Sequence, residues 1–282
     1  MNGTHVPTRA LPSGDEMPIV GFGTWRLHGD TLYTALDGAI EAGYRHFDTA
    51  QAYGNEAAIG EHLAEYDRAE VFLTSKVVGS DLAYDRVIRT CEESIERLGS
   101  DYLDLFLIHF PNPAVSLRET LAAMATLHDE GLVRNVGVSN FNAYRLSCAL
   151  HLTDVPIAVN QLEFHPLYQQ SRTVKYCHEH DVIVEAAAPL GRGQVFDDAV
   201  ITSIAERLGK TNAQVALRWA IERDTIPLPR SSDPAHIREN LDLFSWELDE
   251  KARERLDDRS ARSPAYSMPT EHWSHETYGI AR

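Results

Sequence analysis

The sequence predicts a (β/α)8 barrel, a fold in which parallel strands alternate with helices around a closed core. Two observations support this. Short apolar runs alternate with segments of helical spacing, and no linker or low-complexity tract interrupts them. The chain has 282 residues, which suits one large barrel or two ordinary domains. An open, doubly wound sheet is the competing fold, and the unbroken repeats favour closure into a barrel.

The elements are expected in the following order. Residues 9–18 have polar turn residues between apolar flanks, which predicts a small β-hairpin that caps the bottom of the barrel. Strands are predicted at 19–22, 46–48, 71–76, 103–109, 135–139, 157–161, 182–187 and 225–228. Helices are predicted at 31–42, 55–65, 84–98, 117–130, 142–152, 171–180, 199–222 and 234–241. We expect one domain over 1–282, with the barrel at about 19–258 and a C-terminal tail at 259–282.

Polar residues stand where the predicted strands end. The residues at or just beyond these ends are Asp48, Lys76, His109, Asn140, Gln161 and Arg230. In (β/α)8 barrels the carboxyl ends of the strands carry the chemistry, so we expect these side chains to meet at one mouth of the barrel.

A phenol, an ammonium, a carboxylate and an imidazole are the parts of a proton-transfer site built around tyrosine. Tyr53 follows Asp48 closely, and its reference pKa near 10 makes it a poor acid at neutral pH. Lys76 is expected to lower that pKa by about 1–3 units. Asp48 can hold the lysine charged, and His109 can orient a substrate oxygen. This set suits the protonation of a developing oxyanion in carbonyl reduction.

Each of these residues also has an ordinary structural explanation. Asp48 could cap a loop, Lys76 could be solvated, and His109 could be a satisfied core histidine. The presence of four such residues at successive strand ends favours the catalytic interpretation.

Composition excludes several other functions. The net charge of −16 argues against nucleic acid or an anionic membrane surface as a general partner. The N-terminus lacks an apolar signal segment and the chain has no run of 18 apolar residues, so we expect a soluble, cytoplasmic protein. No metal site is predicted, because His178 and His180 face different ways on a predicted helix. Three cysteines without CxxC spacing are expected to be packed thiols, namely Cys91, Cys148 and Cys177.

The chain resembles the aldo-keto reductase superfamily from about Leu11 to Asp258. The motifs that carry the resemblance are GYRHFDTA at 43–50 with YGNE at 53–56, LGSDYLDLFLIHFP at 98–111, GVSNF at 137–141, NQLEFHP at 160–166, PRS at 229–231 and IREN at 237–240. The resemblance implies a catalytic tetrad of Asp48, Tyr53, Lys76 and His109, with Tyr53 as general acid and base. A histidine at position 109 accompanies carbonyl reduction in this family, whereas a glutamate accompanies reduction of a steroid double bond.

The resemblance also implies a nicotinamide cofactor and a substrate pocket. Ser139, Asn140 and Gln161 would hold the carboxamide, Thr24 and Asp48 would lie beside the ribose, and Glu239 and Asn240 would face the adenine. The other implied cofactor contacts are Ala187, Leu190, Arg230, Ser231 and His236. The pocket would be lined by Trp25, His109, Phe110 and Trp273, with Phe110 in place of the usual tryptophan.

Two departures from the family pattern concern the cofactor. Ala187 stands where an aromatic residue often stacks on the nicotinamide. His236 stands where an arginine commonly grips the 2′-phosphate, although Arg230 keeps one guanidinium and Ser231 could add a hydroxyl at the start of the next helix. We therefore expect NADPH to be preferred over NADH, by a smaller margin than in relatives with arginine.

The sequence thus predicts a monomeric, NADPH-dependent oxidoreductase that reduces a small aldehyde or ketone. The alternative is a cofactor-binding barrel with a sensing or structural role and little turnover, and the complete tetrad counts against it. The tail after Asp258 is rich in aromatic residues, among them Trp273. It could wall the substrate pocket at the barrel mouth or pack on the side of the barrel.

Overall fold

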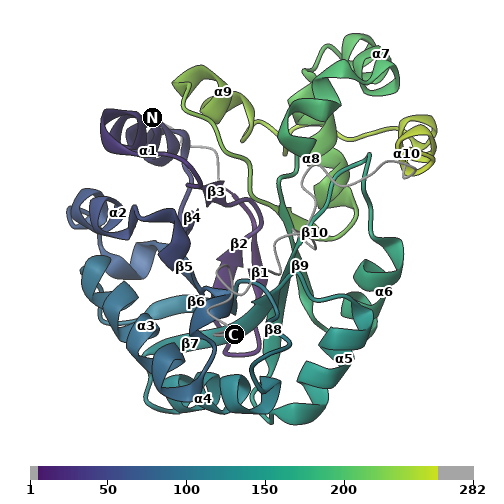
Figure 1. Ribbon diagram of the computed structural model, residues 1–282. Coiled ribbons are helices and arrows are strands. Elements are labelled where there is room, and N and C mark those ends of the chain that lie inside the picture. Colours follow the sequence, from purple (N-terminus) through teal and green to yellow (C-terminus); the bar gives the residue numbers. More distant parts are fainter. Residues whose placement is uncertain (1–5, 260–282) are drawn as a thin grey trace.

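Eight parallel strands curl into a barrel surrounded by helices (Figure 1) in the computed structural model, which describes residues 6–259. Neighbouring strands pair in sequence order from β3 to β10. The Gly21 N–H donates to the Pro227 carbonyl over 3.1 Å, and the Gly23 N–H donates to the Pro229 carbonyl over 3.0 Å. These bonds join the first strand to the last, so the sheet closes and the predicted (β/α)8 barrel is confirmed.

All the predicted strands are present, with bounds that agree to within about three residues. They are β3 (Phe22–Gly23), β4 (His46–Asp48), β5 (Phe72–Val77), β6 (Leu103–Ile108), β7 (Val133–Ser139), β8 (Ile157–Glu163), β9 (Ile183–Ala187) and β10 (Thr225–Pro227). The helices are α1 (Gly29–Ala42), α2 (Glu56–Leu63), α3 (Tyr84–Arg97), α4 (Leu117–Asp129), α5 (Ala143–Leu152), α6 (Ser171–Glu179), α7 (Ala199–Leu208), α8 (Asn212–Glu222), α9 (Pro234–Glu239) and α10 (Glu250–Asp257). Short 3₁₀ segments are η1 (Gln51–Tyr53), η2 (Arg68–Glu70), η3 (Gly79–Asp81) and η4 (Gly191–Asp197).

The predicted N-terminal hairpin is present and closes the bottom of the barrel. Strands β1 (Thr8–Ala10) and β2 (Glu16–Pro18) pair antiparallel and lie across the ring of strands in Figure 1. The hairpin buries Leu11 and Met17 against the apolar interior of the barrel. The barrel residues of this cluster are Phe72, Leu105, Leu107, Ala158, Val159, Ile183 and Ile226.

The barrel interior changes from apolar to polar toward the carboxyl ends of the strands. Side chains alternate between the two faces of a strand, so residues two apart share the interior. On β5 the interior residues run from Phe72 through Thr74 to Lys76, and on β9 they run from Ile183 to Glu185. All five are buried, so the polar ones must find partners inside the barrel.

The helices differ from the prediction in two places. The single helix expected at 199–222 is two helices, because Gly209 ends α7 in a left-handed conformation (φ 62°). A capping box between Thr211 and Gln214 then starts α8. Helix α10 was not predicted; the Asp249 side chain caps its first turn, and Leu256 is buried.

The described part of the chain agrees with the expectations about cysteines. All three cysteines are free thiols, and Cys91 and Cys177 are buried. Burial raises the pKa of both of these thiols, which keeps them protonated and unreactive. Within residues 6–259, no helix combines the length and the hydropathy needed to span a membrane.

Candidate active site

Strand ends and one short 3₁₀ segment bring the four predicted catalytic residues together at the barrel mouth. Asp48 ends β4, Lys76 lies near the end of β5, and His109 follows β6. Tyr53 lies in η1, and Asn55 anchors the segment after it. The buried Asn55 side-chain amide donates to the carbonyls of Thr24 (2.9 Å) and Leu27 (3.1 Å). The tyrosine is therefore held against the mouth by the loop that follows β3.

Lys76 is the centre of the site. Its side chain is fully buried, and its Nζ donates to Asp48 Oδ1 (2.7 Å), to the Thr49 carbonyl (2.8 Å) and to the Tyr53 hydroxyl oxygen (3.4 Å). An ammonium has three N–H donors, and each has an acceptor here. Because the phenol oxygen accepts from Lys76, the phenol proton is left to donate elsewhere.

For both Lys76 and Tyr53, burial and the neighbouring charge shift the pKa in opposite directions. Burial alone would lower the pKa of Lys76, but the Asp48 carboxylate raises it overall, so the lysine stays charged. Burial raises the pKa of Tyr53, and the charge of Lys76 opposes that rise without cancelling it. The expected net lowering of the pKa of Tyr53 is therefore wrong for this structure. The tyrosine is a protonated phenol at neutral pH.

His109 packs beside the phenol. Its ring meets the Tyr53 ring edge-on at 5.7 Å between centroids and stacks on Phe110 at 4.9 Å. Burial, with the charge of Lys76, lowers the pKa of His109 to about 3, so its imidazole is neutral near pH 7. Within residues 6–259 no hydrogen bond engages a ring nitrogen of His109. The ring can donate one hydrogen bond to a substrate oxygen, and it holds no acidic proton to give.

Gln161 links the tetrad to a second carboxyl group. Its Nε2 donates to Asp48 Oδ2 and to Glu185 Oε2, each over 2.8 Å. The two amide hydrogens are thus used, which fixes the side-chain orientation. Among the described residues Gln161 Oε1 has no hydrogen-bond partner, so it can accept from an amide such as a carboxamide.

Ser139 and Asn140 lie in the same wall. The Ser139 hydroxyl donates to the Gln161 carbonyl (2.9 Å), and Asn140 Nδ2 donates to Ser139 Oγ (3.0 Å) and to the His109 carbonyl (2.9 Å). Asn140 has a left-handed backbone (φ 62°), which asparagine tolerates better than most residues. The structure therefore joins the three residues expected at a carboxamide to the tetrad by direct hydrogen bonds.

Three guanidinium groups lie close together at the mouth of an otherwise acidic protein. The guanidinium carbons of Arg26 and Arg192 lie 4.3 Å and 4.4 Å from the Trp25 ring centroid. Burial, followed by the charges of Arg26 and Arg192, lowers the pKa of Arg230. No carboxylate within residues 6–259 forms an ion pair with Arg26 or Arg230. Clustered guanidinium groups of this kind suit a phosphate or pyrophosphate group.

The segment after β10 differs from the expected anion site. The Asp233 side chain caps α9 by accepting from the Ala235 N–H (2.7 Å), and the Ser231 hydroxyl accepts from the Asp233 N–H (3.0 Å). Asp233 also lies 3.8 Å from His236. A carboxylate thus occupies the helix start where a phosphate was expected. Glu239 accepts a hydrogen bond from Thr211 (2.7 Å).

Comparison with known proteins shows the family of the chain. The sequence pattern of the Aldo/keto reductase family matches residues 19–260. The chain belongs to this family. An aldo-keto reductase from Mycolicibacterium smegmatis is 41% identical over 245 residues, which cover 86% of this chain and 89% of that protein. An NADP-dependent D-sorbitol-6-phosphate dehydrogenase from Malus domestica is 35% identical over an alignment that covers 96% of this chain and 99% of that enzyme. The crystal structure of a Bombyx mori aldo-keto reductase in complex with NADP has a TM-score of 0.88 and 32% identity, with coverage of 94% and 96%.

Among this reductase's predicted site residues, the structure connects the tetrad, Ser139, Asn140 and Gln161 in one network. The Trp25 ring lies beside the guanidinium groups of Arg26 and Arg192. The Phe110 ring stacks on His109. The Thr24 hydroxyl donates a hydrogen bond to the backbone carbonyl of Asp48 (2.9 Å). Ala187 ends β9, and Leu190 immediately precedes η4. Asn240 is buried after α9. Trp273 lies outside the described residues.

Three residues that belong to this site were missed. Glu185 was hidden within an apolar strand, although a charged residue in such a run is itself a signal. Arg26 and Arg192 lie in loops after strands far apart in sequence, and only the closed barrel brings them together.

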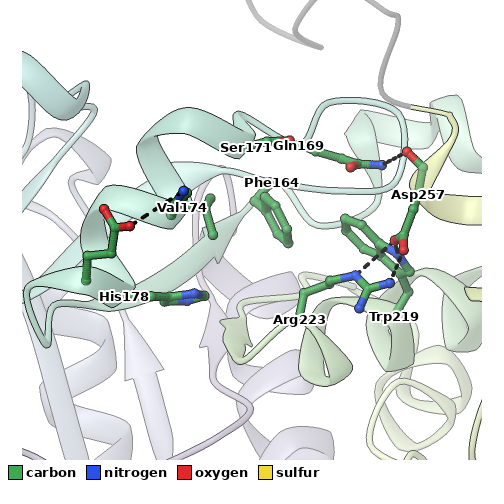
Figure 2. Close-up of a pocket in the computed structure, with 10 residues that line it drawn as sticks. Phe164, Gln169, Ser171, Val174, His178, Trp219, Arg223 and Asp257 are labelled. Atoms are coloured by element: carbon green, nitrogen blue, oxygen red, sulfur yellow. Dashed lines mark hydrogen bonds and ion pairs between the residues drawn. The ribbon is translucent and has the colours of Figure 1, made fainter. Parts of the chain in front are cut away.

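A separate cavity, whose lining contains no tetrad residue, lies on the outer wall of the reductase (Figure 2). It measures about 560 Å³ and is bordered by α6, α8 and the end of α10. Phe164 and Trp219 stack at 4.9 Å to form its wall, and the Arg223–Asp257 ion pair forms its edge. None of these groups contacts the network around Lys76, so this cavity is no part of the candidate active site.

Proposed function

We propose that this enzyme reduces a small aldehyde or ketone to the alcohol with NADPH, and that Tyr53 is the general acid. The observation that carries the proposal is the fully buried Lys76, which donates to both Asp48 and the Tyr53 oxygen. This arrangement supplies a protonated phenol whose conjugate base has a cation beside it.

The chain's own residues account for the proton-transfer half of the reaction. When bound, the reduced nicotinamide supplies the hydride that reaches the carbonyl carbon. Tyr53 donates its proton to the carbonyl oxygen as negative charge develops there, and Lys76 stabilises the phenolate that remains. Neutral His109 donates a hydrogen bond to the same oxygen and orients it. The phenolate then regains a proton from solvent.

The donor set fits a nicotinamide dinucleotide. Gln161 Oε1 can accept from the carboxamide N–H₂, and Ser139 and Asn140 flank that position. Arg26 and Arg230 provide guanidinium groups for the phosphates. Relatives of known structure support NADP-type cofactors, since the Bombyx mori reductase was crystallised with NADP.

The proposal is tested by mixing the purified protein with NADPH and a reactive aromatic aldehyde and following the loss of NADPH absorbance. A panel of aldehydes, ketones and sugars, each with NADPH and with NADH, then ranks the substrates. Turnover that depends on both the carbonyl compound and the reduced cofactor supports the proposal. Tight cofactor binding without turnover on any panel member favours a sensing or structural role.

The position of Asp233 provides a test of the preference for NADPH over NADH. Its carboxylate lies 3.8 Å from His236, beside the proposed 2′-phosphate position, and repels a dianionic phosphate. Replacing Asp233 with asparagine keeps the helix cap but removes the charge. Both side chains are largely exposed, so we expect NADPH to bind roughly 2- to 5-fold more tightly, a surface-charge effect of modest size. The affinity for NADH should not change, because NADH lacks the 2′-phosphate.

Dissociation constants for NADPH and NADH, measured by fluorescence titration, decide this prediction. His236→Arg is the companion variant, and it should also tighten NADPH selectively. An equal effect of Asp233→Asn on both cofactors would place the 2′-phosphate away from α9.

A further inference from the structure

A second carboxyl group lies next to the tetrad inside the barrel. Glu185 is fully buried on β9, where it pairs in register with Gln161 of β8. The Gln161 Nε2 atom donates to Asp48 Oδ2 and to Glu185 Oε2, each over 2.8 Å. Because the two oxygens share one nitrogen, they lie within about 6 Å of each other. Two carboxylates this close in the buried interior of a protein repel strongly if both are ionised.

Within the described residues, no lysine or arginine forms an ion pair with Glu185. Its only ion-pair contact in the described residues is His46 of β4, whose Nε2 lies 3.4 Å from Glu185 Oε1. Burial lowers the pKa of His46 to about 3, so that imidazole is neutral. Lys76 of β5 donates its three N–H groups to Asp48, Thr49 and Tyr53, and none of these bonds goes to Glu185. On the other side, β10 presents only the apolar Ile226 in register with Glu185.

These surroundings favour an uncharged Glu185. Burial first, and then the Asp48 charge, raise the pKa of Glu185 to about 8. Within residues 6–259 the Glu185 Oε1 atom forms no hydrogen bond and lies 3.4 Å from His46 Nε2, so this oxygen can carry the acid proton in the neutral form.

We propose that Glu185 is a positioning residue of the tetrad, which in its neutral form shares the Gln161 amide with Asp48 and in its ionised form adds a second negative charge below the Lys76–Tyr53 pair. This inference rests on the proposed function, and it deepens that function by naming a group that sets its pH range. Glu185 is fully buried and acts through Gln161 and through its charge.

The sign of the effect follows from the charges around Tyr53. An ionised Glu185 disfavours the Tyr53 phenolate, and it also helps Lys76 to stay charged. The phenol therefore keeps its proton to higher pH in the wild type than it would without Glu185. Removing the ionisable group should lower the pH at which Tyr53 loses its proton.

Glu185→Gln is the decisive variant, because it keeps the volume and the hydrogen bond from Gln161 but cannot ionise. We expect the alkaline limb of carbonyl reduction, and the acid limb of alcohol oxidation, to shift down by about 0.5–1 pH unit. This is less than the 1–3 units typical of a charge in direct contact. Glu185→Asp keeps an ionisable group and should shift these limbs less than Glu185→Gln does.

Asp104→Asn is the matched control. Asp104 is also a buried carboxyl, and burial raises its pKa too, but it pairs with Arg68 (2.6 Å) on the outer face of β6. Its replacement should lower the melting temperature without moving either limb of the pH profile. A shift of the same size in this control would mean that loss of overall stability, and not the charge of Glu185, moves the pH profile.

A second readout needs no turnover. A carboxyl whose folded pKa is raised from about 4.5 to about 8 binds more protons in the folded than in the unfolded state between these values. Wild-type stability should therefore fall, relative to Glu185→Gln, as the pH rises through that window. The difference in melting temperature between variant and wild type should widen in favour of the variant from about pH 5 to about pH 9. A merely structural role predicts a constant difference.

The outcomes distinguish failure of the proposed role of Glu185 from failure of the proposed carbonyl reduction. A constant melting difference overturns the titration of Glu185. A widening difference with an unmoved pH profile overturns its coupling to Tyr53. If the wild type turns over no substrate, the proposed function fails. The coupling is then judged by the ultraviolet difference spectrum of phenolate formation, using Tyr53→Phe to isolate the Tyr53 signal. An unchanged titration of that signal in Glu185→Gln rejects the coupling, and a shift to lower pH supports it.

Discussion

Replacing Tyr53 with phenylalanine is expected to abolish carbonyl reduction while leaving cofactor binding intact. The substitution removes one hydroxyl, which is the phenol oxygen that accepts a hydrogen bond from Lys76. His109 cannot take over as the acid, because its imidazole is neutral well above pH 3. Positioned acid catalysis is typically worth about 10²–10⁴-fold, so we expect a loss in kcat of that size. Steady-state kinetics, together with NADPH titration, measure both quantities.

The same variant should fold normally. Tyr53 is partly exposed at the barrel mouth, and the phenylalanine ring keeps its edge-on packing against His109. Lys76 retains its bonds to Asp48 and Thr49. The melting temperature should therefore move little, and Tyr144→Phe, at a well-exposed surface tyrosine, is the matched control for loss of a phenol. Near-normal turnover in Tyr53→Phe would end the proposed mechanism.

The fold and the tetrad could be predicted because both depend on local pattern. Parallel strands in a barrel are buried on both faces, so each strand appears as a short apolar run. The polar residues that close these runs then share one mouth, whatever their separation in sequence. This is why Asp48, Lys76 and His109 could be grouped from the sequence alone.

Other features depend on register and burial, which the pattern does not contain. Glu185 meets Gln161 only because β8 and β9 pair residue 161 with residue 185. The pKa of Tyr53 is raised and not lowered, because its desolvation outweighs the charge of Lys76. The strength of that desolvation depends on the packing around the ring. The break between α7 and α8, by contrast, was readable from Gly209 and Thr211.

Replacing Lys76 with methionine is expected to cost both stability and turnover. Methionine fills similar space but leaves the Asp48 carboxylate buried, with Gln161 as its one remaining side-chain donor in the described structure. Loss of one partner of a buried ion pair typically costs about 3–5 kcal/mol. For a chain of this size that corresponds to a fall in melting temperature of roughly 6–20 °C. Turnover should fall about 10²-fold or more, since the phenolate loses its cation.

The double variant Lys76→Met/Asp48→Asn separates these two effects. Asparagine removes the unpaired buried charge while keeping an acceptor for Gln161, so much of the lost stability should return. Turnover should not return, because no cation then lies near Tyr53. Stability changes that are not additive between Lys76→Met and Asp48→Asn, together with turnover that stays low in the double variant, indicate that Asp48 holds Lys76 in place and that Lys76 acts on the phenol. If Lys76→Met melts like the wild type, then Asp48 is not an ionised partner, and the charge arrangement argued for this site does not hold. If turnover recovers in the double variant, the catalytic requirement is a neutral, well-packed pocket, and the lysine charge contributes nothing to the acidity of Tyr53.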